Sequence, residues 1–182
     1  LASGSPRRRE LMVGLGVNYE VRILPDVDES YPDTLQGEEI PLYIAKEKAD
    51  AYIPMMQPDE LIITADTIVW LDGEVLGKPR DREDALQMLR TMSGRTHEVF
   101  TGVCITTTDW QRSFTAQTEV RFATLSEDEI IYYVDNFKPM DKAGAYGVQE
   151  WIGFIGVENI SGSYYNIMGL PVQKLYRELL KV

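Results

Sequence analysis

Asp66 is a carboxylate in an otherwise apolar part of the chain, between residues 61–63 and 68–71. The surrounding residues predict a buried strand, in which a charge is costly unless a cation, a metal or hydrogen bonds compensate it. Asp72-Gly73 is a turn signal that reverses the chain, and the returning arm ends at Lys78, which stands between a glycine and a proline. A buried acid and a conformationally restricted lysine on one hairpin predict chemistry on an anionic group.

A second group of charges lies at the start of the first predicted helix. Ser5 is a suitable N-cap and Gly16 a suitable stop, and Arg7, Arg8 and Arg9 occupy the first turn. Cations are unfavourable at a helix N-terminus because of the helix dipole. The arrangement therefore predicts an anion-binding site made of backbone N–H groups, Ser5 and guanidinium groups. The alternative is that the arginines pair with surface carboxylates, which an acidic chain can supply.

These residue types suit phosphoryl chemistry assisted by a hard divalent cation. The carboxylates of Glu29 and Asp66, together with phosphate oxygens of a substrate, can hold Mg²⁺ or Mn²⁺. A carboxylate near that metal can orient or deprotonate an attacking water, so Asp66 is a candidate general base, metal ligand or both. The basic side chains that would neutralise a polyphosphate are Arg7, Arg8, Lys48 and Lys78. Taken singly, each of these residues also fits a solvated surface charge, Lys48 above all.

The elements that would position these residues alternate between helices and strands. The predicted strands are the stretch around Asp66 and residues 18–24, 97–107, 112–124 and 149–157. The predicted helices start at Pro6, span about 41–52, 81–92 and 126–137, and start again at Pro171, with polar loops over 25–37 and 161–169. No linker or repeat interrupts the pattern, which predicts one α/β domain over 1–182 with a mixed, partly antiparallel sheet.

Composition excludes several classes of protein. The formal net charge of −11 over 182 residues makes broad adhesion to nucleic acid or anionic membranes unfavourable. The single cysteine, Cys104, excludes an intrachain disulfide and a cysteine-based zinc site, and it fits a small buried hydrophobe. The single histidine, His97, fits a structural role. No apolar run approaches the roughly 20 residues of a membrane span, so a cytoplasmic protein is expected. A magnesium-binding P-loop, a G-x-S-x-G elbow and an H-E-x-x-H motif are missing from the sequence.

Six segments resemble the Maf family. They read L-A-S-x-S-P-R-R-x-E-L over 1–11, A-D-T-x-V over 65–69, L-G-K-P over 76–79, S-G-x-x-H-x-V-x-T-G-V over 93–103, D-K-A-G-A-Y-G-V-Q over 141–149 and G-S-Y-x-N-x-x-G-L-P over 162–171. The resemblance implies an inosine-triphosphatase-like fold with a cleft between two lobes. It also implies a cytoplasmic, metal-dependent pyrophosphatase that splits a nucleoside triphosphate into the monophosphate and pyrophosphate. The resemblance further implies a homodimer and a link to septum formation in cell division.

The resemblance also implies roles for individual residues. Asp66 matches the family's proposed proton acceptor. The positions that surround phosphates and metal are matched by Ser5, Arg8, Glu29, Lys48 and Lys78, and the positions of the dTTP/UTP branch are matched by Arg7, Thr67 and Gln149. A glutamine can pair with the edge of uracil or thymine through one donor and one acceptor. Glu150-Trp151 follows Gln149, where many family members have glycine.

Two other functions stay open at this point. The first is a nucleotide-binding regulator of cell division with little turnover, which would bind nucleotides without hydrolysing them. The second is an ordinary phosphatase that releases inorganic phosphate, although the D-x-D signature of aspartyl-phosphate enzymes is missing because Ile68 occupies its second position. Modified pyrimidine nucleotides are possible substrates beside dTTP and UTP.

Overall fold

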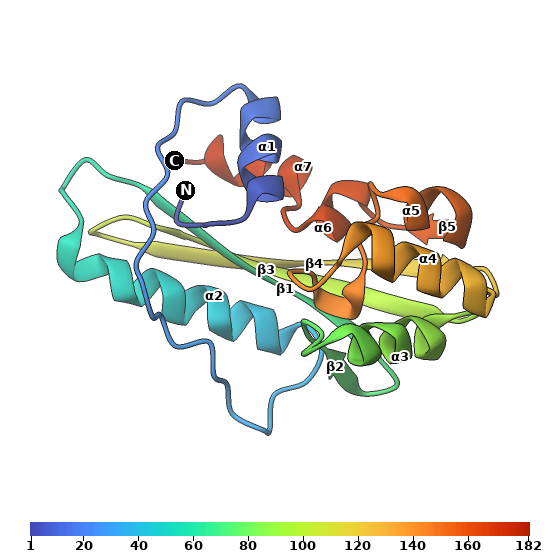
Figure 1. The fold of residues 1–182 in the computed structure, drawn as a ribbon. Coiled ribbons are helices and arrows are strands. Elements are labelled where there is room, and N and C mark those ends of the chain that lie inside the picture. Colours follow the sequence, from blue (N-terminus) through green and yellow to red (C-terminus); the bar gives the residue numbers. More distant parts are fainter. The chain divides into compact units, whose positions relative to one another are not determined.

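The structure, a computed structural model, describes residues 1–182 and is built from helices and one sheet (Figure 1). The sheet has five strands in the order β2-β1-β3-β4-β5, namely β1 (Ile62–Leu71), β2 (Glu74–Leu76), β3 (Thr96–Thr106), β4 (Gln111–Phe122) and β5 (Val157–Ser161). The helices are α1 (Pro6–Leu15), α2 (Glu39–Tyr52), α3 (Arg82–Met92), α4 (Glu127–Phe137), α5 (Trp151–Gly156), α6 (Tyr164–Met168) and α7 (Val172–Leu179), with short 3₁₀ turns η1 (Ile53–Met55) and η2 (Ala143–Ala145). The β1–β2 and β4–β5 pairs are antiparallel. The predicted α/β class is confirmed.

The chain divides into two compact units. The first contains Leu1–Thr67, Phe100–Ala116 and Gly169–Val182, and the second contains Ile68–Val99 and Gln117–Met168. β1, β3 and β4 each contribute residues to both units, whereas every α-helix belongs to one of them. None of these helices combines the length and the apolar character that crossing a membrane would require.

In the first unit, α1 begins and ends where the sequence predicts. Ser5 is the N-cap and its hydroxyl accepts a hydrogen bond from the Arg8 N–H, while Gly16 ends the helix with φ +70°. A positive φ is strained for residues with a Cβ, which explains the glycine at this stop. α1 lies beside α7, close to both ends of the chain (Figure 1).

α2 is fixed to the sheet of the first unit at two points. The Thr64 hydroxyl of β1 donates to the Ala45 carbonyl of α2 at 2.6 Å. A Cβ added to Gly102 of β3 would lie 2.4 Å from backbone atoms of Pro41 and Leu42, so the helix start can approach the strand only at a glycine. Cys104 packs in the core that includes α2 alanines, and its predicted role as a small buried residue is confirmed.

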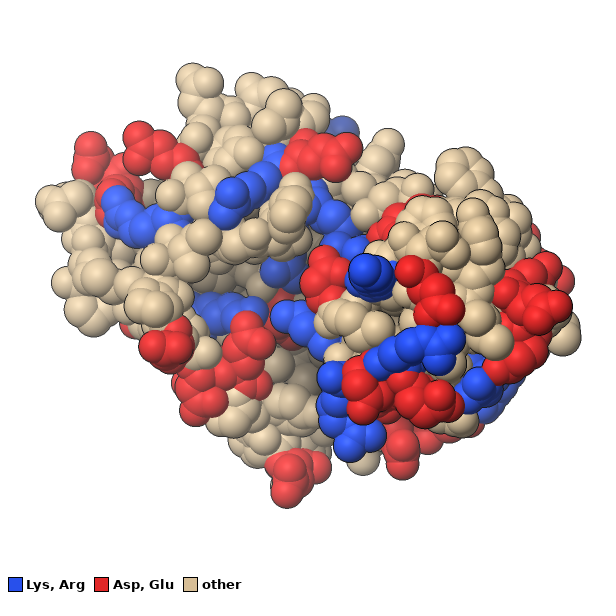
Figure 2. All heavy atoms as spheres, viewed as in Figure 1, with Lys and Arg blue, Asp and Glu red and all other residues tan.

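In the second unit, the predicted hairpin and helix caps are present. Asp72 and Gly73 both have positive φ, 53° and 85°, as a tight turn between β1 and β2 requires. Asp81 caps α3, and Ser126 forms the predicted capping box of α4. α3 and α4 pack side by side, and Figure 2 shows basic and acidic side chains interleaved over them. The ion pairs that join them are Arg82–Asp135 and Arg90–Glu127.

Two predicted strands are wrong. Residues 18–24 form no strand, because the backbone of this segment bonds to Leu1 and to the Tyr52 hydroxyl rather than to a neighbouring strand, and Val21 and Ile23 are exposed. Residues 149–157 contain helix α5 instead, followed by β5. The burial of Ile152 and Gly156, four residues apart, and the exposure of 84% of Phe154 follow a helical period. The predicted loop over 161–169 contains the short helix α6.

His97 is the buried centre of an aromatic cluster in the second unit. Its ring packs edge-on against Phe122 and Tyr146, with centroids 5.0 and 5.3 Å away. Its Nε2 lies 2.6 Å from the Tyr146 hydroxyl, while Nδ1 is buried and has no hydrogen-bond partner. Burial lowers the pKa of His97 from 6.5 to about 4, so the folded protein holds this ring neutral. These contacts agree with the structural role predicted for the residue.

We expect His97 to make folding stability fall as the solution is acidified. The folded pKa of about 4 lies below the unfolded value of 6.5, so between these two pH values the unfolded chain takes up a proton that the folded chain does not. The resulting stabilisation is complete above pH 6.5 and its loss towards pH 4 amounts to roughly 3 kcal/mol. Urea unfolding of the wild type and His97→Gln across this range measures the difference. A folded-state imidazole NMR signal that titrates near 6.5 would contradict this account, and the signal is unambiguous because the chain has one histidine.

Candidate active site

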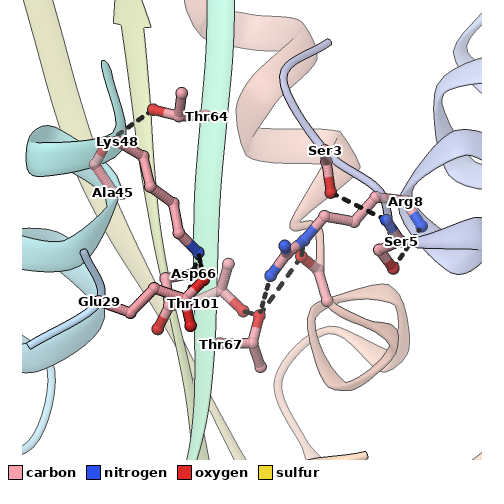
Figure 3. A network of polar contacts seen from close by, with 11 residues as sticks. Ser3, Ser5, Arg8, Glu29, Ala45, Lys48, Thr64, Asp66, Thr67 and Thr101 are labelled. Atoms are coloured by element: carbon pink, nitrogen blue, oxygen red, sulfur yellow. Dashed lines mark hydrogen bonds and ion pairs between the residues drawn. The ribbon is translucent and has the colours of Figure 1, made fainter. Parts of the chain in front are cut away.

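Lys48 joins the two candidate carboxylates of the first unit. Its Nζ lies 2.9 Å from Asp66 Oδ1 and 2.8 Å from Glu29 Oε1 (Figure 3). The side chains of Lys48 and Asp66 are only 14% and 15% exposed, whereas that of Glu29 is 58% exposed. The charge predicted to be costly within the strand is therefore compensated by a cation from α2. Glu29 adds a second carboxylate from the long loop before that helix.

The periods of the strand and the helix explain this meeting. Thr64 and Asp66 are two residues apart on β1 and so project to the same face of the strand. Ala45 and Lys48 are three residues apart on α2 and so share one face of the helix. The Thr64–Ala45 hydrogen bond fixes the register of helix against strand, and Lys48 then reaches Asp66 one step further along both elements.

Arg8 forms a second group in the same unit, with Thr67 and Gly169. Its Nε donates to the Gly169 carbonyl at 2.7 Å and its Nη2 donates to Thr67 Oγ1 at 3.1 Å (Figure 3). Thr67 also lies 2.9 Å from the buried Thr101 hydroxyl of β3. Gly169 has φ +116°, a conformation that favours glycine, and it directs its carbonyl at Arg8. These contacts engage Nε and Nη2 of the guanidinium and leave Nη1 without a bond to the protein.

The Arg8 and Lys48 groups act on each other electrostatically. Burial lowers the pKa of the Arg8 guanidinium, the charges of Asp66 and Glu29 raise it again, and Arg7 lowers it. An arginine still stays protonated in a protein, so the site holds positive and negative charges in a partly water-excluded volume. The unfavourable placement of Arg8 at a helix N-terminus is offset by the carboxylates and by the two oxygen contacts that its guanidinium makes within the unit.

The predicted anion site at the start of α1 differs from expectation in one respect. Two of its backbone N–H groups are already occupied, since the Ser5 N–H donates to Ser3 Oγ and the Arg8 N–H donates to Ser5 Oγ. Arg9 donates to the Ser3 carbonyl. The partners of Arg8 and Arg9 are carbonyl and hydroxyl oxygens rather than surface carboxylates, which counts against the alternative prediction. Guanidinium groups, more than backbone amides, would bind an anion here.

The other two predicted site residues lie in the second unit. Lys78 is exposed on the segment that leaves β2. Gln149 lies between η2 and α5, and its Oε1 atom is buried without a hydrogen-bond partner. An unpaired buried acceptor is unfavourable in a protein, so a donor from water or from a ligand would stabilise this atom. Their roles beside the residues of the first unit stay predictions.

Glu29 and Asp66 could hold a hard divalent cation. The chain offers no group of three or more histidine, cysteine, aspartate or glutamate side chains for a metal. Two carboxylates nevertheless fit Mg²⁺ or Mn²⁺, because Mg²⁺ is usually held by one or two carboxylates together with substrate phosphates and water. Lys48 lies between the same two carboxylates, so the cation and the ammonium would compete for their oxygens.

Thr101 and the Gly169 carbonyl were not predicted as site residues. Both contact Thr67 or Arg8, which were predicted. A backbone carbonyl has no side-chain signal, although a glycine before Leu170-Pro171 is a recognisable turn feature. Thr101 is followed by Gly102, which packs tightly against α2. This contact could not be predicted from the sequence because it depends on where the helix lies.

Comparison with known proteins gives full-length matches. The family described as Maf-like protein matches residues 1–182. The dTTP/UTP pyrophosphatase of Bacteroides thetaiotaomicron is 72% identical over 182 residues, which cover 100% of this chain and 94% of that protein. The dTTP/UTP pyrophosphatase of Porphyromonas gingivalis is 54% identical over 181 residues, 98% of this chain and 91% of that protein. That of Flavobacterium psychrophilum is 51% identical over 180 residues, 99% of this chain and 92% of that protein.

Proposed function

The chain belongs to the Maf family, and from this premise we propose that it hydrolyses dTTP and UTP to the nucleoside monophosphate and pyrophosphate. The names of its full-length relatives support the reaction and the substrates. The observation that carries the proposal is the partly buried Asp66, held by Lys48 beside Glu29 and within the field of Arg8. The match over 1–182 supports one functional domain.

Asp66 is the group that we assign to the proton of the attacking water. As the water oxygen bonds to the α-phosphorus, its proton passes to the Asp66 carboxylate, and the bond from phosphorus to the bridging oxygen breaks to release pyrophosphate. Lys48 orients Asp66 through a 2.9 Å contact. Arg8 presents to phosphate oxygens the N–H groups of Nη1 and Nη2 that Gly169 and Thr67 do not occupy.

A divalent cation completes the proposed site. Glu29 and Asp66 would hold it, and when bound it supplies charge neutralisation to the phosphate oxygens. Ser5, Arg7 and Lys78 are proposed as further phosphate contacts, and Thr67 and Gln149 as contacts that select the nucleotide, on the strength of their positions in the family motifs. Mg²⁺ or Mn²⁺, a cytoplasmic location and a homodimer stay predictions.

A panel of nucleotides tests the proposal. Purified protein is incubated with dTTP, UTP, CTP, GTP, ATP or 7-methyl-GTP and with Mg²⁺ or Mn²⁺, and pyrophosphate and phosphate are measured separately. We expect pyrophosphate release, fastest from dTTP and UTP. Preference for 7-methyl-GTP would retain the reaction and remove the base assignment, whereas release of inorganic phosphate would indicate a phosphatase. Binding without any hydrolysis would favour the alternative function, a nucleotide-binding regulator of cell division.

A further inference from the structure

Gln149 lies in a tight turn of the second unit. The Glu150 N–H donates to the Gly147 carbonyl at 3.0 Å, so Val148 and Gln149 are the two central residues of this turn. Gln149 Oε1 is buried without a hydrogen-bond partner. The orientation of the turn therefore determines where an unpaired acceptor is presented.

Three side chains hold this turn at both of its ends. The buried Tyr133 hydroxyl of α4 accepts the Gly147 N–H at 3.0 Å and donates to Glu150 Oε2 at 3.3 Å. The Lys142 ammonium lies 2.9 Å from Glu150 Oε1, and the two side chains are only 12% and 19% exposed. Lys142 also pairs with the exposed Asp141. Burial raises the pKa of Tyr133, so its hydroxyl stays a protonated donor to Glu150.

The backbone of the turn is adapted to this clamp of Tyr133, Lys142 and Glu150. A Cβ added to Gly147 would lie 2.6 Å from Glu150 Oε1 and 2.9 Å from Lys142 Cε. The ion pair therefore packs directly on the glycine Cα, and a side chain at this position would displace it. These contacts at both ends of one four-residue turn restrict its motion.

We propose that Tyr133, Lys142 and Glu150 are positioning residues that hold Gln149 Oε1 for a donor on the base and thereby set the selectivity for uracil and thymine over cytosine. The inference rests on the proposed function. Uracil and thymine carry a donor at N3, whereas the same atom of cytosine is an acceptor. A fixed, desolvated acceptor on the protein favours the former and penalises the latter, because unpaired polar groups in a site are costly. If the turn were mobile, the Gln149 amide could hydrogen-bond to water, and the discrimination between the bases would be lost.

Tyr133→Phe tests the clamp, because it removes one oxygen atom and both of its hydrogen bonds. We expect kcat/KM for UTP to fall on the order of tenfold, mainly through KM, and the preference for UTP over CTP to fall with it. Tyr132→Phe is the matched control, since this neighbouring tyrosine on α4 is 48% exposed and lies outside the clamp. Glu150→Gln provides a second variant if Tyr133→Phe unfolds.

A double-mutant cycle with Gln149→Ala separates positioning from a general structural effect. If the clamp acts through Gln149, then Tyr133→Phe changes the UTP preference in the wild type but not in the Gln149→Ala background. Equal losses in both backgrounds, or an unchanged preference in the wild-type background, would overturn the inference.

The same cycle is measured as the Kd of a non-hydrolysable α,β-methylene analogue of UTP or CTP, so that it does not depend on turnover. If the analogues show the expected cycle but UTP is not hydrolysed, then the proposed function fails and the positioning role stands. If the wild type does not discriminate between the two analogues, then the positioning role is refuted whatever the enzyme hydrolyses.

Discussion

Asp66→Asn is expected to lower kcat for dTTP and UTP by about 10²–10⁴-fold, the usual worth of a positioned general base. The amide keeps the size of the side chain and can still contact Lys48, but it cannot take up the proton of the attacking water. The substitution also removes one of the two carboxylates that compensate the Lys48 ammonium, which stays partly buried with Glu29 alone. The loss of the proton acceptor should appear in kcat, whereas the loss of a cation ligand should appear in nucleotide binding.

Single-turnover pyrophosphate release and the Kd of a non-hydrolysable analogue separate these two effects. Asp109→Asn is the matched control, because this exposed aspartate lies on the turn between β3 and β4. It should leave kcat unchanged. A variant that lacks the Asp66 carboxylate and still turns over at the wild-type rate would show that another group accepts the proton.

The parts of the fold that were predicted correctly are those with local causes. Ser5, Asp81 and Ser126 cap helices through hydrogen bonds to residues three positions further along, so the signal and its effect lie within one turn. The Asp72-Gly73 turn is equally local. In each case the backbone hydrogen bonds are made by residues close in the sequence. Tertiary packing therefore does not change the structure that the sequence predicts.

The two mistaken strands have separate causes. A Cβ on Gly153 would lie 1.7 Å from the Val148 carbonyl oxygen, so the close approach of these two residues at the start of α5 requires a glycine. The apolar run around Ile152 does not reveal that contact, and its short length left strand and helix indistinguishable. Apolar and polar residues alternate in the segment 18–24 as they do in a strand. The segment nevertheless makes too few backbone hydrogen bonds with the chain near Leu1 to form a β-ladder.

The candidate site also combines features that the sequence predicts with features that only the fold reveals. The sequence indicated that Asp66 needs a compensating partner, but Lys48 by itself fitted a solvated lysine. Only the register of α2 on β1, fixed by Thr64 and Ala45, brings the two charges together. The clamp around Gln149 was hidden for a similar reason, since Tyr133 joins it from a helix that carried no chemical motif.

Removal of divalent cations is expected to abolish turnover, with a loss on the order of 10³-fold or more, because the cation is proposed to contribute several kcal/mol of charge neutralisation. Dialysis against EDTA followed by graded return of Mg²⁺ or Mn²⁺ measures this dependence. Full activity in excess chelator would contradict the requirement.

The structure predicts, in addition, that the cation and the nucleotide bind together. The Lys48 ammonium occupies the space between Glu29 and Asp66, at 2.8 and 2.9 Å, and repels a dication. Two carboxylates alone are also too few ligands for Mg²⁺, which needs the oxygens of the triphosphate. Calorimetric titration of Mg²⁺ into the free protein should therefore show a Kd of about 1 mM or weaker. Lys48→Met removes the competing charge, so it should tighten the binding of Mg²⁺ to the free protein while it slows turnover. Tight binding of Mg²⁺ to the nucleotide-free wild type would instead place the cation site away from Lys48.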